Sequence, residues 1–249
     1  MKLLYIDAGN SSIKLAYKNG RKLEVETVGS INHLAGKLND LTNTYTFFKA
    51  VISSVLNNKN TVLLKKTLFK FVKEIVSVSD VAKRIIKTKY DLKRLGEDRV
   101  AALLYVIFIN ASPAVIVDTG TAITVDYLDA SNNFLGGYIC SGLDLEYQAL
   151  SMNTQKLPEI NPYSKRTDKI PLNTDTAIKM GVLKVKALGI SKMIETDLKK
   201  MNKDILNWNV FLTGGSAGIF KSYLDNVVTV DNMVLKGLAK IPINKLSIN

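Results

Sequence analysis

The sequence predicts an α/β protein built from two copies of one sheet-and-helix unit around a cleft. Two stretches carry this prediction: YIDAGNSSIK, residues 5–14, and VIVDTGTAIT, residues 115–124. Each is an apolar strand that runs into Asp-x-Gly and then into hydroxyl side chains. Asp7 and Asp118 lie roughly 110 residues apart, which is the length of one small domain. Because no Gly/Ser-rich linker separates the halves, we expect them to share an interface and form a cleft.

The first half reads as a hairpin followed by alternating helices and strands. Residues 2–7 alternate as a buried strand does, and two further strands flank Asn19-Gly20, a strong hairpin signal, so the opening strands should be antiparallel. The expected elements are strands over 2–7, Ile13–Tyr17 and Leu23–Val28, a helix over Asn32–Leu41, a strand over Phe48–Val55, a helix over Leu63–Phe71, a strand over Ile75–Ser77, and an apolar helix over Glu97–Asn110 that Pro113 ends.

The second half repeats this order. The expected elements are strands over Ala114–Val117, Ile123–Leu128 and Phe134–Ile139, helices over Leu143–Thr154 and Asp175–Met201, a strand over Val210–Leu212, a helix, a strand over 227–230, and a closing helix from Met233. We read this repeat as a structural duplication. The boundary is placed near Ser112-Pro113, which gives domains 1–112 and 113–249.

Composition excludes several classes of site. A single cysteine, Cys140, allows no intrachain disulfide and no Cys-based zinc site. The single histidine, His33, lies in the polar context INHLAG and reads as a surface or capping residue rather than a triad member. Catalysis therefore has to rest on carboxylates, lysines, arginines, hydroxyls and backbone. No apolar run reaches the roughly 18 residues of a membrane span, and the start does not read as a signal peptide, so we expect a cytoplasmic protein without a membrane partner.

The formal net charge of +12 raises the question of nucleic-acid binding. The lysines are scattered over what read as solvated helix faces, as in LLKKTLFKFVKEI, and no basic block is interleaved with aromatic residues. We therefore expect no nucleic-acid partner. The net charge either results from a lysine-rich composition without a role in function, or it creates an electrostatic field that attracts small anionic substrates.

The first Asp-x-Gly stretch has the residues of a phosphate-binding loop. Gly9 lets backbone N–H groups approach a ligand closely, and residues 10–12 offer short polar groups to phosphate oxygens. Lys14 can neutralise phosphate charge, and Asp7 makes sense if it faces Mg²⁺, directly or through water. The alternative is a tight turn with a solvated aspartate. The repeat at Asp118-Thr119-Gly120-Thr121 favours the nucleotide interpretation.

Two further motifs have a structural and a functional interpretation. FLTGGSAGIF places Gly214 and Gly215 between a strand and a helix, where they form a simple turn or a flat surface for a purine nucleoside. This is not a Walker A loop, because no G-K-S/T follows. In NTDTAIKMG, Asn173 or Thr174 can cap the long helix and also meet a ligand, and the two roles are compatible.

The stretch LGEDRVAAL has the residues of a phosphoryl-acceptor site. Gly96 breaks the chain before an apolar helix, and the acids Glu97 and Asp98 are favoured at a helix start, so a capping role is the alternative. Capping does not explain Arg99, whose cation is unfavourable in the first turn. An adjacent carboxylate and guanidinium suit phosphoryl transfer, since one accepts a hydroxyl proton and the other holds an acidic substrate.

Together, and in this order, these motifs resemble those of type III pantothenate kinases, of the acetate-and-sugar-kinase, Hsp70 and actin superfamily. The resemblance runs nearly end to end. The matching positions are Asp7, Gly9, Asn10, Ser11 and Lys14; Gly96, Asp98 and Arg99; Asp118, Gly120, Thr121, Ala122, Thr124 and Asp126; Gly136, Gly137, Ile139 and Gly142; and Asn173, Thr174, Ala177 and Gly181.

The resemblance implies two ribonuclease-H-like, actin-like ATPase domains around an interdomain cleft. It also implies ATP-dependent phosphorylation of pantothenate to 4′-phosphopantothenate, the first step of coenzyme A synthesis. Asp98 would be the general base and Arg99 the partner of the pantothenate carboxylate. The implied ATP-binding residues are Asp7, Ala8, Gly9, Asn10, Ser11, Ser12, Ile13, Lys14, Thr121, Gly214 and Gly215, and the implied pantothenate-binding residues are Tyr90, Gly96, Glu97, Asp98, Arg99 and Thr174.

The family likeness further implies two cations and a homodimer. Mg²⁺ would accompany ATP at Asp7, directly or through water, and a monovalent cation, K⁺ or NH₄⁺, would bind at Asp118. Thr174 would reach pantothenate across the subunit interface.

The chain departs from the family pattern at two places. Ser141 stands where the family usually has proline, which removes a restraint from the loop after the strand. The segment YDLKRLGEDR lacks the usual Asn-Pro and is one residue shorter than common forms, which bears on Tyr90.

Two other functions are compatible with the same fold. Another small-molecule kinase of the superfamily would lack G-x-D-R and N-T-x-x-A, which match the acceptor side of this family. A nucleotide-binding regulator that has lost catalysis is the second alternative, and the intact Asp98 speaks against it.

Overall fold

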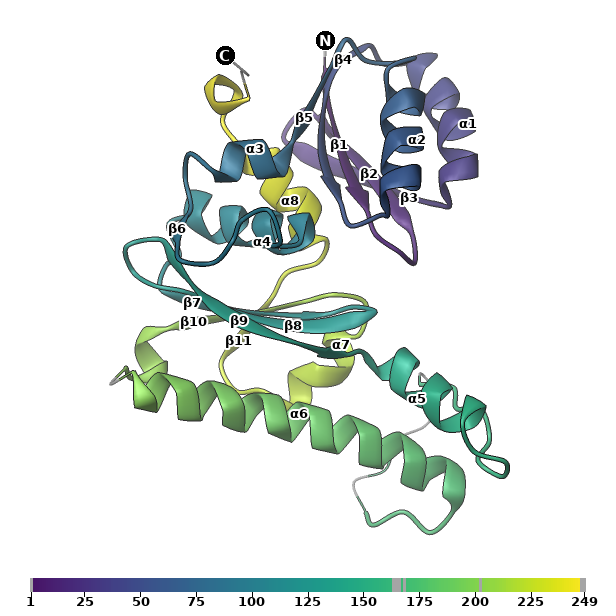
Figure 1. Cartoon of the computed structure of the whole chain (residues 1–249), viewed down its shortest axis with the longest axis vertical. Coiled ribbons are helices and arrows are strands. Elements are labelled where there is room, and N and C mark those ends of the chain that lie inside the picture. Colours follow the sequence, from purple (N-terminus) through teal and green to yellow (C-terminus); the bar gives the residue numbers. More distant parts are fainter. Residues whose placement is uncertain (1, 163–166, 168, 202, 247–249) are drawn as a thin grey trace. The chain divides into compact units, whose positions relative to one another are not determined.

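The computed structural model describes residues 2–162, 167, 169–201 and 203–246 (Figure 1). The chain divides into two compact units. The first comprises Met1–Ser112, Leu128–Gly136 and Asn232–Asn249, and the second comprises Pro113–Tyr127 and Gly137–Asp231. The domain limits 1–112 and 113–249 stay a prediction.

The first sheet has five strands in the order β3-β2-β1-β4-β5. Strands β1, β2 and β3 are antiparallel neighbours, as the sequence predicted, whereas β4 and β5 continue the sheet in parallel. Gly20 has a φ of 60° in the turn between β2 and β3, which is why a glycine closes this hairpin. The bounds are β1 Lys2–Ala8, β2 Ile13–Asn19, β3 Lys22–Gly29, β4 Phe47–Ser54 and β5 Glu74–Ser77.

The second sheet repeats this arrangement, with the order β11-β10-β7-β8-β9-β6. The parallel strands β10 and β11 lie on one side of β7, and β8 and β9 lie on the other, where β6 is added beside β9. Asp7 and Asp118 each occupy the last but one position of the first strand, β1 and β7. The topology thus supports the predicted duplication. The bounds are β6 Lys87–Thr88, β7 Ala114–Thr119, β8 Ala122–Leu128, β9 Asn133–Ser141, β10 Asn209–Thr213 and β11 Val227–Thr229.

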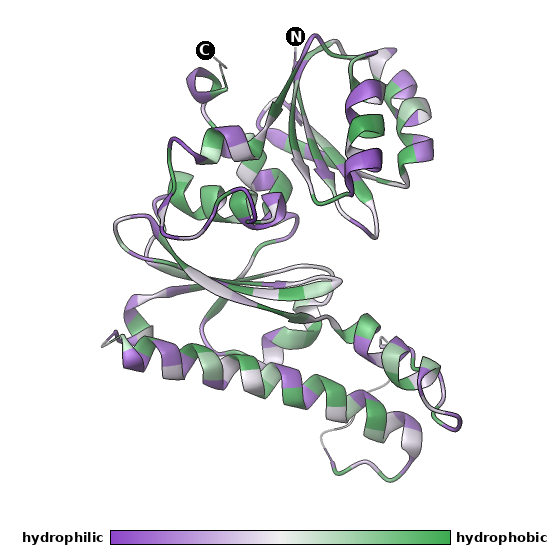
Figure 2. Cartoon of the chain, viewed as in Figure 1, coloured by the Kyte–Doolittle hydropathy of each residue, from purple (hydrophilic) through white to green (hydrophobic). Residues whose placement is uncertain are grey.

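Helices flank the first sheet on both sides (Figure 1). On one side α1, Ile31–Thr42, and α2, Asn58–Leu68, bury their apolar stripes against alternate residues of β1, β2 and β4. On the other side α4, Glu97–Phe108, and α8, Met233–Lys240, contact each other and the sheet. Helix α4 is coloured hydrophobic over most of its surface in Figure 2, and most of its residues are buried. The short helix α3, Val78–Ala82, lies beside it.

In the second unit, the long helix α6 runs along one side of the sheet (Figure 1). Its buried residues recur at helical spacing and form a core with β7, β8 and β10. The other helices are α5 Leu143–Met152, α6 Thr174–Lys200 and α7 Ala217–Phe220, and the chain has 3₁₀ turns at Ile205–Asn207, Lys221–Tyr223 and Ile243–Lys245.

Most predicted elements are confirmed to within a few residues, and two of the differences have local causes. Helix α2 begins at Asn58 rather than at Leu63, because Asn57 Oδ1 caps it by accepting a hydrogen bond from the Asn60 N–H at 2.9 Å. Helix α4 ends at Phe108, well before Pro113, because Asn110 adopts a left-handed conformation with a φ of 54°. The short elements α3 and β6 were not predicted.

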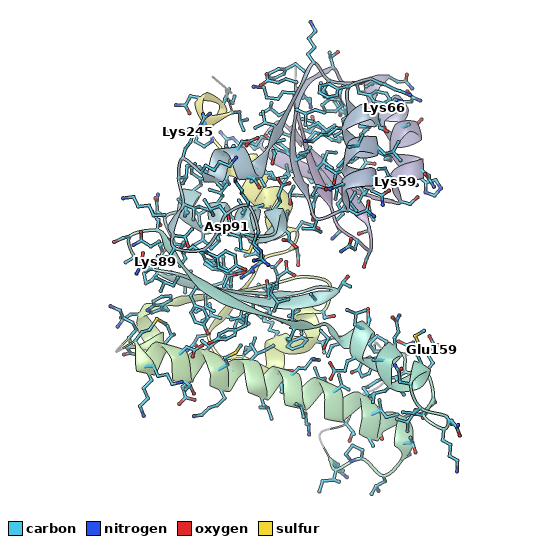
Figure 3. The ribbon with its side chains drawn as sticks, in the orientation of Figure 1. Lys59, Lys66, Lys89, Asp91, Glu159 and Lys245 are labelled. Atoms are coloured by element: carbon cyan, nitrogen blue, oxygen red, sulfur yellow. The ribbon has the colours of Figure 1, made fainter. Side chains whose placement is uncertain are left out.

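Many of the lysines behind the positive charge stand on solvated faces, as predicted, whereas Lys49 and Lys179 are buried. Lys59 and Lys66 on α2, together with Lys89 and Lys245, are exposed and project outward (Figure 3). Among the described residues, no helix is both long enough and apolar enough to cross a membrane.

Candidate active site

A tight turn carries the first phosphate loop out of β1. The Gly9 N–H donates to the Ser12 carbonyl at 3.1 Å, and a Cβ on Gly9 would lie 3.3 Å from that oxygen. The turn returns the chain antiparallel, so that Lys14 on β2 pairs in register with Asp7 on β1. The loop therefore sets an ammonium beside the carboxylate at the end of the strand.

The pKa of Asp7 is raised because the side chain is buried and lies near another carboxylate. Burial, and then the Asp98 carboxylate, raise the pKa of Asp7 to about 6, while Lys14 acts in the opposite sense. The first unit therefore brings together three predicted site residues that come from β1, β2 and α4. A bound cation would favour the ionised form of Asp7 at such a place.

The surroundings of Asp7 fit a hydrated Mg²⁺ that arrives with a nucleotide. Ser53 pairs in register with Asp7 on the neighbouring strand β4. Its hydroxyl is 1% exposed and has no hydrogen-bond partner among the described residues, and a buried hydroxyl of this kind ordinarily bonds to a water or a ligand. Over all the residues that the structure describes, no three His, Cys, Asp or Glu side chains lie close enough together to hold a metal ion without other ligands. Mg²⁺ typically uses only one or two carboxylates, with phosphates and waters.

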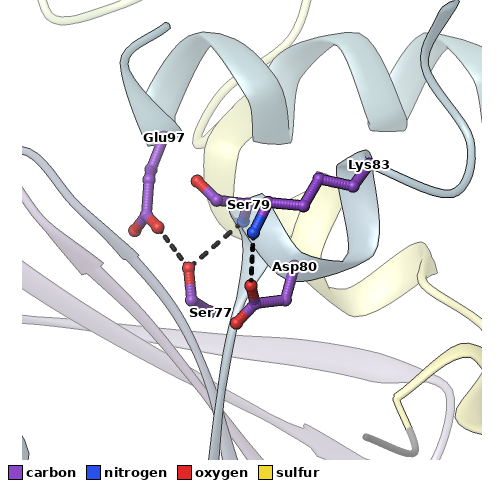
Figure 4. Close-up of polar contacts among 5 residues, drawn as sticks. All are labelled: Ser77, Ser79, Asp80, Lys83 and Glu97. Atoms are coloured by element: carbon purple, nitrogen blue, oxygen red, sulfur yellow. Dashed lines mark hydrogen bonds and ion pairs between the residues drawn. The ribbon is translucent and has the colours of Figure 1, made fainter. Parts of the chain in front are cut away.

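Glu97 anchors the start of α4 to the first sheet (Figure 4). Its Oε2 accepts a hydrogen bond from the Ser54 N–H at 2.7 Å, and its Oε1 accepts one from the Ser77 hydroxyl. The Ser77 Oγ also accepts from the Ser79 N–H at 3.2 Å, so the contact continues into α3. Glu97 was expected to contact substrate, and the structure gives both its carboxylate oxygens protein partners.

The next residue, Asp98, folds back over the helix start. Its Oδ1 accepts a hydrogen bond from the Arg99 N–H at 2.8 Å. A Cβ on Gly96 would lie 2.5 Å from the same oxygen, so any larger residue here would displace the Asp98 carboxylate from this position. The G-x-D-R pattern thus has a steric reason within this chain.

Arg99 lies beside two aromatic rings that also contact each other. It is only 5% exposed, and its guanidinium carbon lies 5.9 Å from the ring centroid of Tyr90 and 5.7 Å from that of Phe134. The Tyr90 N–H donates to Thr88 Oγ1 at 2.9 Å, and this hydroxyl donates to the Phe134 carbonyl at 2.8 Å. Pairing of β6 with β9 therefore brings Tyr90 close to Arg99, although the segment over residues 90–99 is one residue shorter than common forms of the family. Sequence reasoning missed Phe134, whose signal was an aromatic residue shortly before Gly136-Gly137.

In the second unit, the second phosphate loop and the Gly-Gly turn are joined. Gly214 has a φ of 94°, and a Cβ there would lie 2.5 Å from Asp118 Oδ1. The Thr119 hydroxyl donates to the Thr213 carbonyl at 2.8 Å, and the Ser216 N–H donates to the Thr119 carbonyl at 3.0 Å. The structure therefore brings the predicted cation residue Asp118 next to the predicted adenosine turn.

The turn after β9 supports the second loop from the other side. A Cβ on Gly142 would lie 2.2 Å from the Gly120 carbonyl oxygen and 2.5 Å from that of Thr121, and the Gly142 N–H donates to the latter at 2.9 Å. A carboxylate at Asp118 with carbonyl oxygens in the following residues is an all-oxygen donor set, which fits a hard cation.

Polar contacts hold this turn where the family usually has proline. The Ser141 hydroxyl donates to Glu146 Oε2 at 2.5 Å and accepts from Lys186 Nζ at 3.0 Å. Lys186 also pairs with Glu146 at 2.6 Å, and Lys186, followed by Ser141, lowers the pKa of Glu146 below its ordinary value. The restraint lost with proline is replaced by a link from the turn to α5 and α6.

Thr174 stands at the start of α6. Asn173 caps this helix, because its Oδ1 accepts from the Thr176 N–H at 3.0 Å, which confirms the capping interpretation for Asn173. Thr174 is exposed and lines an open pocket of about 640 Å³ in the second unit. The other residues of this pocket are Leu150, Leu157, Pro171, Leu172, Asn173, Ala177 and Ile178, and of these the sequence singled out only Asn173 as a candidate ligand contact.

Comparison with known proteins identifies the family. Residues 3–196 match the family model described as Type III pantothenate kinase. This chain belongs to that family. Among curated relatives, the type III pantothenate kinase of Phocaeicola vulgatus is 32% identical over 244 residues, and that of Porphyromonas gingivalis is 30% identical over 248 residues. In both cases the match covers 96% of this chain and 96% of the relative.

Solved structures confirm the predicted fold class. A Campylobacter jejuni protein described as a Baf family transcriptional activator matches with a TM-score of 0.61 and 22% identity, covering 96% of each chain. The ethanolamine utilization protein EutJ of Carboxydothermus hydrogenoformans matches with a TM-score of 0.54 and 12% identity over 97% of this chain and 90% of that one. A Francisella tularensis propionate kinase matches with a TM-score of 0.52 and 9% identity over 96% and 98%. At these identities the likeness concerns the fold alone, an α/β fold of the actin-like ATPase type.

Proposed function

We propose that this chain transfers the γ-phosphoryl group of ATP to the 4′-hydroxyl of pantothenate, the first step of coenzyme A synthesis. Family membership supports the reaction class. The observation that carries the proposal is the start of α4, where Asp98 lies close enough to Asp7 to raise its pKa and the adjacent Arg99 lies beside the rings of Tyr90 and Phe134. One helix turn therefore offers a proton acceptor near the phosphate loop and a cation for an acidic substrate.

Each of these groups has a role in the proposed chemistry. The Asp98 carboxylate accepts the hydroxyl proton while the pantothenate oxygen attacks the γ-phosphorus in line and the bond to ADP breaks. Arg99, with Tyr90 beside it, binds the pantothenate carboxylate and so fixes the hydroxyl at the other end of the molecule. Gly96 leaves room for Asp98, and Glu97 holds the helix start in place.

ATP binding is assigned to the residues that the sequence motifs singled out. We assign its phosphates to the loop over residues 7–14 and to Thr121, and its adenosine to Gly214 and Gly215. Lys14 supplies the positive charge, and the tight turn closed by the Gly9 N–H and the Ser12 carbonyl sets residues 10–12 at the end of β1. The positive φ of Gly214 supports a surface that only glycine can form.

Two cations belong to this proposal. Mg²⁺, which neutralises phosphate charge when bound, would be held by Asp7, with Asp98 and the Ser53 hydroxyl close to it. A monovalent cation, K⁺ or NH₄⁺, would be held by Asp118. The crowding that raises the pKa of Asp7 supports a cation there, since a cation favours the ionised carboxylate.

We also propose a homodimer that completes the pantothenate site with Thr174. In the second unit, several apolar side chains close to the pocket around Thr174 are exposed, and Leu172 is 97% exposed. Contiguous exposed apolar residues of this kind mark association surfaces. The other residues of this group are Met152 and Ile170.

One assay tests the function. Purified protein is mixed with ATP, Mg²⁺, K⁺ and pantothenate, and ADP is measured with and without pantothenate. We expect turnover that requires pantothenate and the monovalent cation, and near-complete loss in Asp98→Asn with ATP binding kept. ADP release that ignores pantothenate would refute the acceptor, and full activity in Asp98→Asn would refute the base. ATP binding without any turnover would favour the catalytically silent regulator.

A further inference from the structure

The ammonium of Lys14 has a partner from a distant part of the chain. Its Nζ donates a hydrogen bond to Asn232 Oδ1 at 3.1 Å, across a sequence separation of 218 residues. Both residues are partly buried and belong to the first unit. The contact lies beside the phosphate loop, because Lys14 pairs in register with Asp7.

Asn232 adopts an unusual conformation in making this contact. It is the N-cap of α8, a position where an asparagine side chain ordinarily accepts a hydrogen bond from the helix start. Here the side chain makes no capping bond within the described residues, and the backbone is left-handed, with φ 51° and ψ 44°. Asparagine tolerates this conformation better than most residues. The amide oxygen is thus directed to Lys14 instead of to its own helix.

Helix α8 is in turn fixed to the helix that carries Asp98. A Cβ on Gly237 would lie only 2.0 Å from the Ala101 carbonyl oxygen, so the backbones of α8 and α4 touch with no side chain between them. The start of α8 can therefore hold Lys14 at a set position relative to α4. Within one unit, a single helix connects the lysine of the phosphate loop to the helix of the base.

We propose that Asn232 is a positioning residue of the nucleotide site, whose amide oxygen holds the Lys14 ammonium in place to meet ATP phosphates. This rests on the proposed function of Lys14. A neutral acceptor suits this role, because it takes one of the three N–H donors of the ammonium and leaves its charge uncancelled for phosphate. A carboxylate at the same place would form an ion pair with Lys14 and compete with the nucleotide.

The test measures ATP binding separately from turnover. Isothermal titration with Mg²⁺ and a non-hydrolysable ATP analogue is carried out on wild type, Asn232→Gly, Asn232→Asp, Lys14→Met and the Lys14→Met/Asn232→Gly double variant. Glycine accepts the left-handed backbone, so Asn232→Gly should fold, and the melting temperature and circular dichroism check this. The matched control is Asn110→Gly, another left-handed asparagine of the first unit, with a φ of 54°.

We expect Asn232→Gly to weaken analogue binding about tenfold, the factor of a hydrogen bond to a charged group, with the pantothenate KM within about twofold of wild type. Asn232→Asp should also weaken analogue binding, without a fall in melting temperature. In the Lys14→Met background, Asn232→Gly should have no further effect, and Asn110→Gly should match wild type.

Other results would overturn the proposal. Unchanged analogue binding in Asn232→Gly would do so, and so would an equal loss in Asn110→Gly or a loss that persists in the Lys14→Met background. A parallel loss of analogue and pantothenate binding with a lowered melting temperature would make Asn232 a structural residue only. Failure of the proposed function would look different from failure of the role of Asn232. Turnover that depends on pantothenate would then be absent, while the variants would still change analogue binding as expected.

Discussion

Replacing Glu97 by glutamine distinguishes an anchor from a substrate contact. The carboxylate accepts two hydrogen bonds, one from the Ser54 N–H and one from the Ser77 hydroxyl. In Glu97→Gln, the amide oxygen can keep the bond to Ser54. The amide NH₂ must then donate to Ser77 Oγ, which already accepts from the Ser79 N–H. Both charge-assisted bonds become neutral ones.

The expected cost follows from these two bonds. A hydrogen bond to a charged group contributes about 1.5–3 kcal/mol and a neutral one about 1 kcal/mol, so for two bonds we expect a loss of roughly 1–4 kcal/mol in the free energy of unfolding. For a chain of this size, each kcal/mol lowers the melting temperature by roughly 2–4 °C. Because Asp98 follows directly, its displacement should lower kcat while the KM for pantothenate changes little.

The assay combines thermal unfolding with steady-state kinetics. The matched control is Glu159→Gln, an exposed glutamate of the second unit that projects outward (Figure 3), where neither the melting temperature nor the kinetics should change. If Glu97→Gln raises the KM for pantothenate and leaves the melting temperature unchanged, the anchoring argument fails. Glu97 would then be the substrate contact that the family resemblance implied.

Three further predictions concern other parts of the molecule. In metal-free, nucleotide-free protein, the pKa of Asp7 is about 6 and exceeds its ordinary 3.8. The stability that Asp7 contributes is therefore fully present below about pH 3.8 and is lost as pH rises to about 6. Asp7→Asn should flatten the fall in melting temperature between about pH 4 and 6, and an unchanged slope would contradict this. Lys186→Met should raise the KM for ATP several-fold, because the turn at Gly142 loses its link to α6, whereas Lys192→Met, which removes an exposed ion pair of the same helix, should not. Leu172→Glu should shift sedimentation from dimer to monomer with loss of turnover, and a fully active wild-type monomer would refute the shared site.

Much of the fold could be predicted because its signals are local. The Asn19-Gly20 turn and the alternation of residues 2–7 each lie within a few residues, and the structure confirms both. Helix α2 was placed five residues late because its first turn, Asn58–Thr61, is polar and has no apolar spacing to recognise. Its cap, Asn57, was the available signal. Elements as short as β6, two residues long, have no periodicity at all.

The candidate site likewise contains residues that have a local sequence signal and residues that have none. The motif residues Asp7, Asp98 and Asp118 could be singled out because glycine patterns surround them. Their partners come from elsewhere in the sequence. Phe134 reaches Arg99 only through the pairing of β6 with β9, and Asn232 reaches Lys14 only because α8 returns to the first sheet. Such contacts follow from tertiary packing and have no local signature.

The return of α8 to the first unit also has a consequence for synthesis on the ribosome. Translation makes β1 to α4 early, but the surface of α4 around Ala101 stays uncovered until residues 233–240 have emerged. A nascent chain that stops short of this helix presents an apolar surface to chaperones and proteases, and its Lys14 lacks Asn232. The covering of α4 and the contact that holds Lys14 therefore both form only after translation has passed α8.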